Sequence, residues 1–198
     1  MTNLRGVYAG VQVPARLALD DAGNLYATEP SSGAVVVRSP EGRLLERVEG
    51  LGRPVGIAVR GGGEGDPRTV YLGDAGDGSV TAYDASWVPQ GQLGDGPGEF
   101  GMPADLAIDP ATGRVYVADT ARDLVAAYLP GSEPQRVVGL FNAPSGVFFD
   151  AGSGELLVSA GALEYLGEIF DFSSFEYVPN YTGGFYVFVF DRELNYVT

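Results

Sequence analysis

The sequence predicts an all-β fold, a β-propeller built from four-stranded antiparallel blades. The first reason is repetition: "PARLALDDAGNLYATE" at Pro14 returns as "PVGIAVRGGGEGDPRTVYLGD" at Pro54, "PADLAIDPATGRVYVAD" at Pro103 and "PSGVFFDAGSGELLVSA" at Pro144, in steps of 40, 49 and 41 residues. The second is that the copies contain short apolar runs divided by turn residues. A sheet of this size cannot bury both faces alone, so a period in the forties favours sheets that cover one another around an axis.

The first and third copies show the plan of a blade most clearly. In the first, strands are expected at 16–20, 24–28, 34–38 and 43–48, separated by "DAG", "EPSSG" and "SPEG". In the third, the corresponding strands are expected at 105–109, 114–119, 124–129 and 135–139. Gly supplies positive φ in such separators, and Asp, Asn and Ser bend the chain locally. Each copy therefore predicts an antiparallel meander.

The second and fourth copies depart from this plan. In the second, 61–67 lengthens the first hairpin, and 87–93 is expected to be a poor strand because Pro89 cannot donate to a ladder. The fourth carries an insertion at 161–184 before an apolar strand at 185–191. A long loop in a tight repeat is usually functional or covers an edge. We predict that its aromatic side chains form a partner-binding surface: Tyr165, Phe170, Phe172, Phe175, Tyr177 and Tyr181.

The stretch "GDGPGEFGMPADLAIDPATGRVYVAD" (94–119) resembles an NHL repeat. The resemblance is good in the first copy as well. It is partial in the second, where Arg60 replaces the Asp, and in the fourth, where Ser159 and Ala160 end the second strand. The resemblance implies a propeller, commonly six-bladed, with functions that range from protein binding and ligand sensing to occasional metal-assisted catalysis. It also favours a secreted or periplasmic bacterial protein.

The repeats divide residues 1–198 into one domain with blades at about 13–53, 54–102, 103–143 and 144–198. Residues 4–10 read as an outer strand that precedes the first copy. We therefore expect an incomplete propeller that belongs to a six-bladed ring. A self-contained four-bladed ring, and a partial ring whose open edges pair with another copy, are the alternatives.

The amino-acid composition excludes or disfavours several classes of partner and of catalytic or metal site. The chain has 12 Arg, no Lys and 26 acidic residues, for a net charge of −14, which disfavours nucleic acid and anionic membrane surfaces. It has no Cys and no His. Disulfides, thiolate nucleophiles, tetrahedral zinc sites and a histidine base are therefore excluded. No apolar run is long enough to span a membrane. No catalytic or cofactor-binding residue is predicted.

Two sets of acidic residues are candidates for a calcium site. Asp20, Asp109 and Asp150 end the innermost strands, and we favour turn capping over a calcium ring for them. Asp74, Asp119 and Asp123 follow second strands, as does Glu29, where loops face one end of the propeller. They could bind a hard cation through oxygen, although no calcium-loop spacing occurs, and solvated loop carboxylates are the favoured interpretation.

Arg16 and Asp105 stand at matching positions of the first and third inner strands. We predict that they line the central channel and face each other, as an ion pair or as part of a ligand site.

The leading functional hypothesis is a non-enzymatic protein-binding scaffold or sensor that presents loop faces and the insertion to a partner. The alternatives are a calcium-assisted lactonase-type hydrolase and a self-assembling subunit that closes open blade edges.

Overall fold

The computed structural model describes residues 11–129, 131, 134–139, 141–162, 167–171, 176–180 and 184–197, with the backbone alone for 162, 167–171 and 176–180. Within these ranges the chain forms β-strands and no helix. The first blade consists of β1 (Leu17–Leu19), β2 (Leu25–Glu29), β3 (Ala34–Arg38) and β4 (Leu44–Val48), and the second of β5 (Pro54–Arg60), β6 (Thr69–Asp74), β7 (Ser79–Tyr83) and β8 (Pro89–Gln92). The third consists of β9 (Pro103–Ile108), β10 (Val115–Asp119), β11 (Leu124–Tyr128) and β12 (Pro134–Val138), and the fourth of β13 (Asn142–Asp150), β14 (Glu155–Ala162) and β17 (Gly184–Asp191), with β15 (Gly167–Asp171) and β16 (Glu176–Asn180) as a separate pair.

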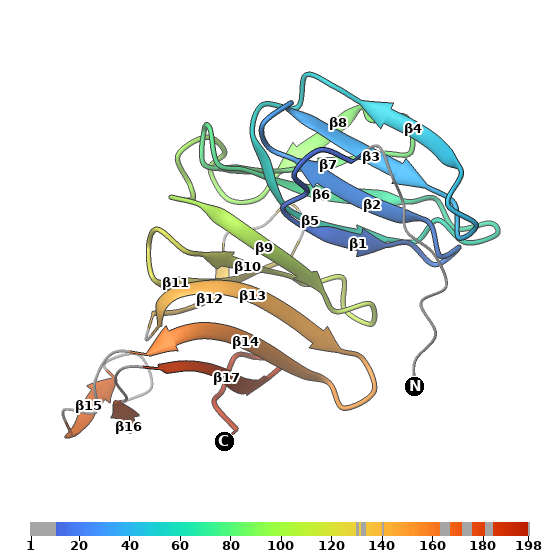
Figure 1. The fold of residues 1–198 in the computed structure, drawn as a ribbon. Coiled ribbons are helices and arrows are strands. Elements are labelled where there is room, and N and C mark those ends of the chain that lie inside the picture. Colours follow the sequence, from blue (N-terminus) through green and yellow to red (C-terminus); the bar gives the residue numbers. More distant parts are fainter. Residues whose placement is uncertain are drawn as a thin grey trace, which may run out of the picture.

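Blades 1 to 3 are four-stranded antiparallel meanders, in which each strand pairs with the next one along the chain. The all-β propeller predicted from the repeats is confirmed. Figure 1 shows the blades following one another in chain order, with β1, β5, β9 and β13 as the inner strands. No helix of the described chain is long and apolar enough to cross a membrane.

Three apolar clusters join neighbouring blades and form the core. Tyr26 and Ile57 belong to the cluster between blades 1 and 2, and Tyr71 and Leu106 to the cluster between blades 2 and 3. The cluster between blades 3 and 4 includes Tyr116, whose ring stacks on that of Phe149 at 5.5 Å between ring centres. Facing sheets of neighbouring blades therefore bury apolar surface against each other, as blades in a propeller do.

Alternation along the inner strands sends successive side chains to opposite neighbours. In β5, Ile57 packs toward blade 1 while Ala58 packs toward blade 3. In β9, Leu106 packs toward blade 2 while Ala107 packs toward blade 4. Since side chains point to alternate faces of a strand, one inner strand serves two interfaces. This is why inner strands carry almost unbroken apolar runs.

The hairpins between the second and third strands of blades 1 and 2 come close to the chain of the next blade. Gly78 has a φ of +68°, and a Cβ added there would lie 2.0 Å from the carbonyl oxygen of Phe100. Phe100 in turn donates its backbone N–H to the carbonyl of Gly78. Only glycine fits both the backbone conformation and the close approach.

The segment around Pro89 is a short strand, although the sequence disfavoured one. β8 is exposed along its whole length and pairs with β7, with a register shift at the pair formed by Tyr83 and Pro89. An edge strand tolerates proline because the missing N–H faces away from the ladder. The outer strand expected at 4–10 lies outside the described residues.

The fourth blade differs from the others. β13, β14 and β17 form a three-stranded sheet, and an isolated bridge joins Phe190 to Tyr196 where a fourth strand stands in the other blades. The insertion forms the antiparallel pair β15–β16, which lies beyond the ends of β14 and β17 (Figure 1). The insertion therefore interrupts the blade without changing its order.

Candidate functional site

The aspartates that end the inner strands each hold the following turn. Asp109 accepts the backbone N–H of Ala111 and the hydroxyl of Thr112, at 2.9 and 2.8 Å. Asp150 does the same with Gly152 and Ser153. These are the capping contacts that Asp makes in tight turns. Asp20 likewise accepts two bonds from Asn24.

The carboxylates that end the second strands bind the chain that leads into the same blade. Glu29 accepts the backbone N–H of Gln12 at 2.5 Å. Asp74 accepts that of Arg53 at 3.1 Å. The fully buried Asp119 accepts two, from Gly101 at 2.7 Å and from Met102 at 2.8 Å. In three blades, therefore, one carboxylate ties the inner strand to the second strand.

Hydrogen bonding also sets the ionisation of Glu29. Burial raises the pKa of this carboxyl, but bonds from the N–H of Gln12, the hydroxyl of Ser32 and the guanidinium of Arg47 outweigh it, and the pKa is lowered. The carboxylate is therefore held ionised by its structural partners.

Asp123 has a different role from the other three candidates. Its φ is +58°, in the hairpin where the second blade has Gly78, and its carboxylate accepts the backbone N–H of Ala143 at 2.7 Å. Asp tolerates this conformation better than most residues. Asp123 therefore links blade 3 to the first strand of blade 4. Within the described ranges no three acidic residues gather in a way that could hold a metal ion.

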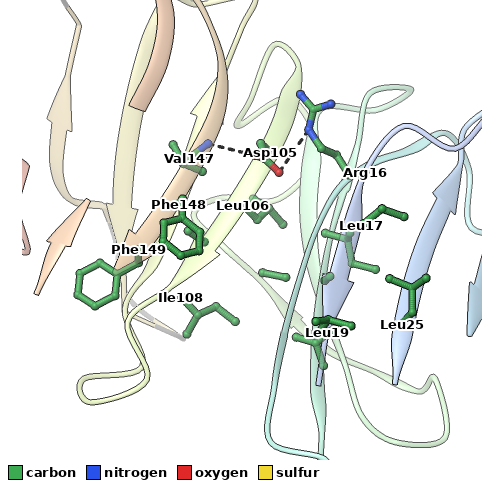
Figure 2. Close-up of a pocket in the computed structure, with 15 residues that line it drawn as sticks. Arg16, Leu17, Leu19, Leu25, Asp105, Leu106, Ile108, Val147, Phe148 and Phe149 are labelled. Atoms are coloured by element: carbon green, nitrogen blue, oxygen red, sulfur yellow. Dashed lines mark hydrogen bonds and ion pairs between the residues drawn. The ribbon is translucent and has the colours of Figure 1, made fainter. Parts of the chain in front are cut away.

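The structure brings Arg16 and Asp105 together. The Nε of Arg16 lies 3.4 Å from Oδ1 of Asp105, although blade 2 separates their blades along the chain. Oδ2 of Asp105 accepts the backbone N–H of Val147 at 3.0 Å, and Arg16 donates to the carbonyl of Ser145. Figure 2 shows the contacts of Asp105 with Arg16 and with Val147 at one end of a cavity. Blades 1, 3 and 4 are thus linked near the axis.

Burial dominates the ionisation of Asp105. Burial raises its pKa, and the N–H of Val147 and the charge of Arg16 compensate only partly. A carboxylate of this kind is costly to keep ionised in the native state. Such groups are enriched in functional sites.

A cavity of about 710 Å³ lies beside this pair, between the inner strands of the four blades. Arg16 and Asp105 are the charged residues among its lining side chains, and the others are apolar. Leu17 and Leu19 stand on one side and Phe148 on the other (Figure 2). The size and the apolar lining are typical of a small-molecule pocket.

The predicted aromatic surface lies outside what the structure describes. Tyr165, Phe172, Phe175 and Tyr181 fall in segments that are not described, and only the backbone of Phe170 and Tyr177 is placed, as a pair between β15 and β16.

Sequence reasoning assigned β17 to the sheet and missed its surface. Phe185 is 92% exposed and Val187 60%. The signal that could have found them is the unbroken run of apolar residues at 185–190, which is unusual for the outer part of a blade.

Comparisons with known proteins show the fold. The hydrazine synthase of Kuenenia stuttgartiensis superposes with a TM-score of 0.63 at 18% identity over 91% of this chain and 52% of that one. A nidogen/laminin complex gives a TM-score of 0.63 at 15% identity, over 88% of this chain and 65% of that one. A streptogramin B lyase gives 0.59 at 15% identity, over 85% and 54%. The chain thus spans between half and two thirds of these proteins.

No protein-family model matches the sequence, and no curated protein matches it. The resemblance to NHL repeats therefore stays a prediction from the motifs, while the propeller fold is shown.

Proposed function

We propose that this chain is a non-enzymatic binding propeller that holds a protein partner on the outer face of blade 4. The strand register supports this. Phe148 of β13 pairs with Leu157 of β14, which in turn pairs with Val189 of β17. Val187 and Phe185 stand two and four residues before Val189 on β17. Alternation puts these five side chains on one face of the sheet.

This face, which we call the blade-4 face (Phe148, Leu157, Phe185, Val187 and Val189), is opposite to the one that packs on blade 3. Phe148, Val187 and Phe185 are each at least 60% exposed. The equivalent faces of blades 1 to 3 are covered by the next blade. An apolar surface of this extent typically marks an interaction site.

The neighbouring β15–β16 pair supports the same proposal. Two-stranded hairpins are marginal on their own and gain stability by packing against something else. This one extends from the ends of β14 and β17 (Figure 1), and Phe185 is the second residue of β17. The nidogen structure, a propeller in complex with laminin, is a precedent for protein binding by this fold.

The test is affinity capture from the source cells with two matched double variants. Phe185→Ser with Val187→Ser removes the exposed end of the blade-4 face. Leu44→Ser with Leu45→Ser removes two exposed apolar side chains from β4 as a control. We expect a specific partner to bind the wild type and the control, and to bind the first variant at least about tenfold more weakly. Equal binding by all three proteins contradicts the proposal.

A further inference from the structure

Two arginines stand on the face of blade 3 that is turned toward blade 4. Tyr116 of β10 pairs with Ala127 of β11, which pairs with Arg136 of β12, so these three side chains share one face of the sheet. Tyr116 and Ala127 pack in the cluster between blades 3 and 4. Arg114 stands two residues before Tyr116 and also contacts blade 4, where it donates to the carbonyl of Arg192. The outer part of this interface therefore carries two cationic side chains from one blade.

A cavity of about 230 Å³ lies where these arginines face blade 4. All but one of its lining residues are polar, and they are Arg114, Ala127, Gln135, Arg136 and Glu193. Glu193 belongs to the turn after β17, so both blades contribute to the cavity. Because one water takes up about 30 Å³, the cavity has room for a small ion together with several waters.

The equivalent place between blades 1 and 2 is occupied by a side chain. In blade 1 the matching row is Tyr26, Val37 and Glu46, so Glu46 stands where blade 3 has Arg136. Arg68 of blade 2 enters here. Its Nη2 lies 3.0 Å from Oε2 of Glu46, and its guanidinium lies 5.5 Å from the ring centre of Tyr26. One cation therefore meets one carboxylate and an aromatic ring.

Blade 4 has a glycine where blade 2 has Arg68. Gly154 and Arg68 are counterparts because each stands two residues before the strand partner of the fourth residue in the matching stretches "GVFFD" and "GIAVR". Glycine has no side chain to enter the interface. The guanidinium of Arg192 in the same blade lies 3.8 Å from Oδ2 of Asp109 and does not line the cavity. An ion pair between blades 1 and 2 thus corresponds to a positively charged cavity between blades 3 and 4.

The protein leaves part of both guanidinium groups unused. Nη1 of Arg114 donates to the carbonyl of Arg192 and lies 3.9 Å from Oε1 of Glu193, whose side chain is 56% exposed. Nη1 of Arg136 donates to Oδ1 of Asn195 at 2.6 Å. Among the described residues no hydrogen bond uses Nη2 of either arginine, and the buried Nε of Arg114 has no partner there. A guanidinium has five N–H donors, so both groups retain donors for an anion.

From this arrangement we propose that the cavity binds a free phosphate or sulfate ion between Arg114 and Arg136. A tetrahedral oxyanion offers oxygen acceptors in several directions, and guanidinium groups bind such ions through charge-assisted, often bidentate hydrogen bonds. Two arginines outweigh the single charge of Glu193, so the cavity favours a dianion over a monoanion. The site lies on the side of blade 4 that faces blade 3, and the proposed protein-binding role of the blade-4 face does not require it.

The first test titrates the unaltered protein with sodium phosphate at constant ionic strength and follows the backbone amides by two-dimensional NMR. We expect saturable shifts at the amides of Gln135, Arg136 and Glu193, and a similar affinity for sulfate. Acetate carries one charge and should bind at least about tenfold more weakly. No saturable shift at these amides, or an equal affinity for acetate, overturns the proposal.

Charge-matched variants then locate the site. Arg136→Gln should weaken phosphate binding by at least about tenfold, since a hydrogen bond from a charged donor is lost. Arg43→Gln removes the same charge from an exposed position in blade 1 and should change the affinity by less than about twofold. Glu193→Gln should tighten binding by about threefold or more because the competing carboxylate is gone, whereas the exposed Glu64→Gln in blade 2 should not. Equal effects within either pair would mean that phosphate follows the net charge of the protein, and the assignment of the cavity is then wrong.

Discussion

Arg16 and Asp105 meet near the propeller axis, with 3.4 Å between Nε of the arginine and Oδ1 of the aspartate. The aspartate also accepts the backbone N–H of Val147, so one carboxylate touches blades 1 and 4 from blade 3. Both residues line the cavity between the inner strands. The pair therefore links blades 1, 3 and 4 near the axis.

The ionisation of Asp105 gives the first prediction. Because burial raises its pKa, the native state binds this proton more tightly than the unfolded chain does. The ionised carboxyl thus costs stability near neutral pH, and the cost disappears as pH falls below the unfolded pKa of about 3.9. We expect Asp105→Asn to be more stable than the wild type at neutral pH, with the gain vanishing near about pH 3. Urea unfolding at both pH values measures this; a loss of stability at neutral pH refutes it.

Asp119 gives a prediction about the carboxylates that end second strands. Asp119→Ala removes the buried acceptor for the N–H groups of Gly101, which is exposed, and Met102, which is partly buried, so each lost bond costs about 0.5–1.5 kcal/mol. We expect a fall of about 1–3 kcal/mol in the free energy of unfolding. The exposed Asp95→Ala serves as control and should change it by less than about 0.5 kcal/mol. Similar values for the two variants would mean that water replaces the carboxylate.

The third residue of the inner strands gives a matched pair of substitutions. Ala107 is buried between blades 3 and 4, and Phe148 is the exposed counterpart in blade 4. Ala107→Phe should overpack the interface and cost at least about 1–3 kcal/mol, whereas Phe148→Ala should cost less than about 0.5 kcal/mol. Thermal unfolding of both variants distinguishes them. A large loss for Phe148→Ala would show that something already covers this side chain.

The carboxylate contacts also bear on calcium. The backbone N–H groups of the chain already bond to Asp74, Asp119 and Asp123. Because these carboxylates are already engaged, we expect the midpoint of thermal unfolding to differ by less than about 1 °C between excess calcium and a chelator. Calcium bound at a hundred times its dissociation constant would instead stabilise the protein by about 2.7 kcal/mol and raise the midpoint measurably. An upward shift of several degrees in calcium would reinstate the hydrolase hypothesis.

The sequence predicted the fold well because the physical signals were local. The third strand of blade 1 was expected at 34–38 and runs from Ala34 to Arg38. It is bounded by the turn sequences "EPSSG" and "SPEG". The turn bonds of Asp109 follow from the same local chemistry. The repeat also put Arg16 and Asp105 at matching places on inner strands, where they are in contact.

Features that depend on neighbouring blades were harder to see. The bond between Asp119 and Met102 requires knowing where the chain enters the blade, 17 residues earlier in sequence. The exposure of Phe148 and Phe185 depends on which face another sheet covers; the unbroken apolar run at 185–190 marks an unusual strand but does not tell which of its two faces is open. The predicted partner surface in the aromatic insertion therefore stays a prediction, and the exposure of Phe185 on the adjacent strand was not predicted.

The central claim, that the blade-4 face holds a protein partner, is tested most directly by photo-cross-linking in the source cells. A photoreactive amino acid is placed at Phe185, and in a second protein at Leu45 on the exposed outer strand of blade 1. We predict one discrete cross-linked product from position 185, containing the same second protein in each repeat, and none of it from position 45. Failure of position 185 to form a product, or the same products from both positions, contradicts the claim.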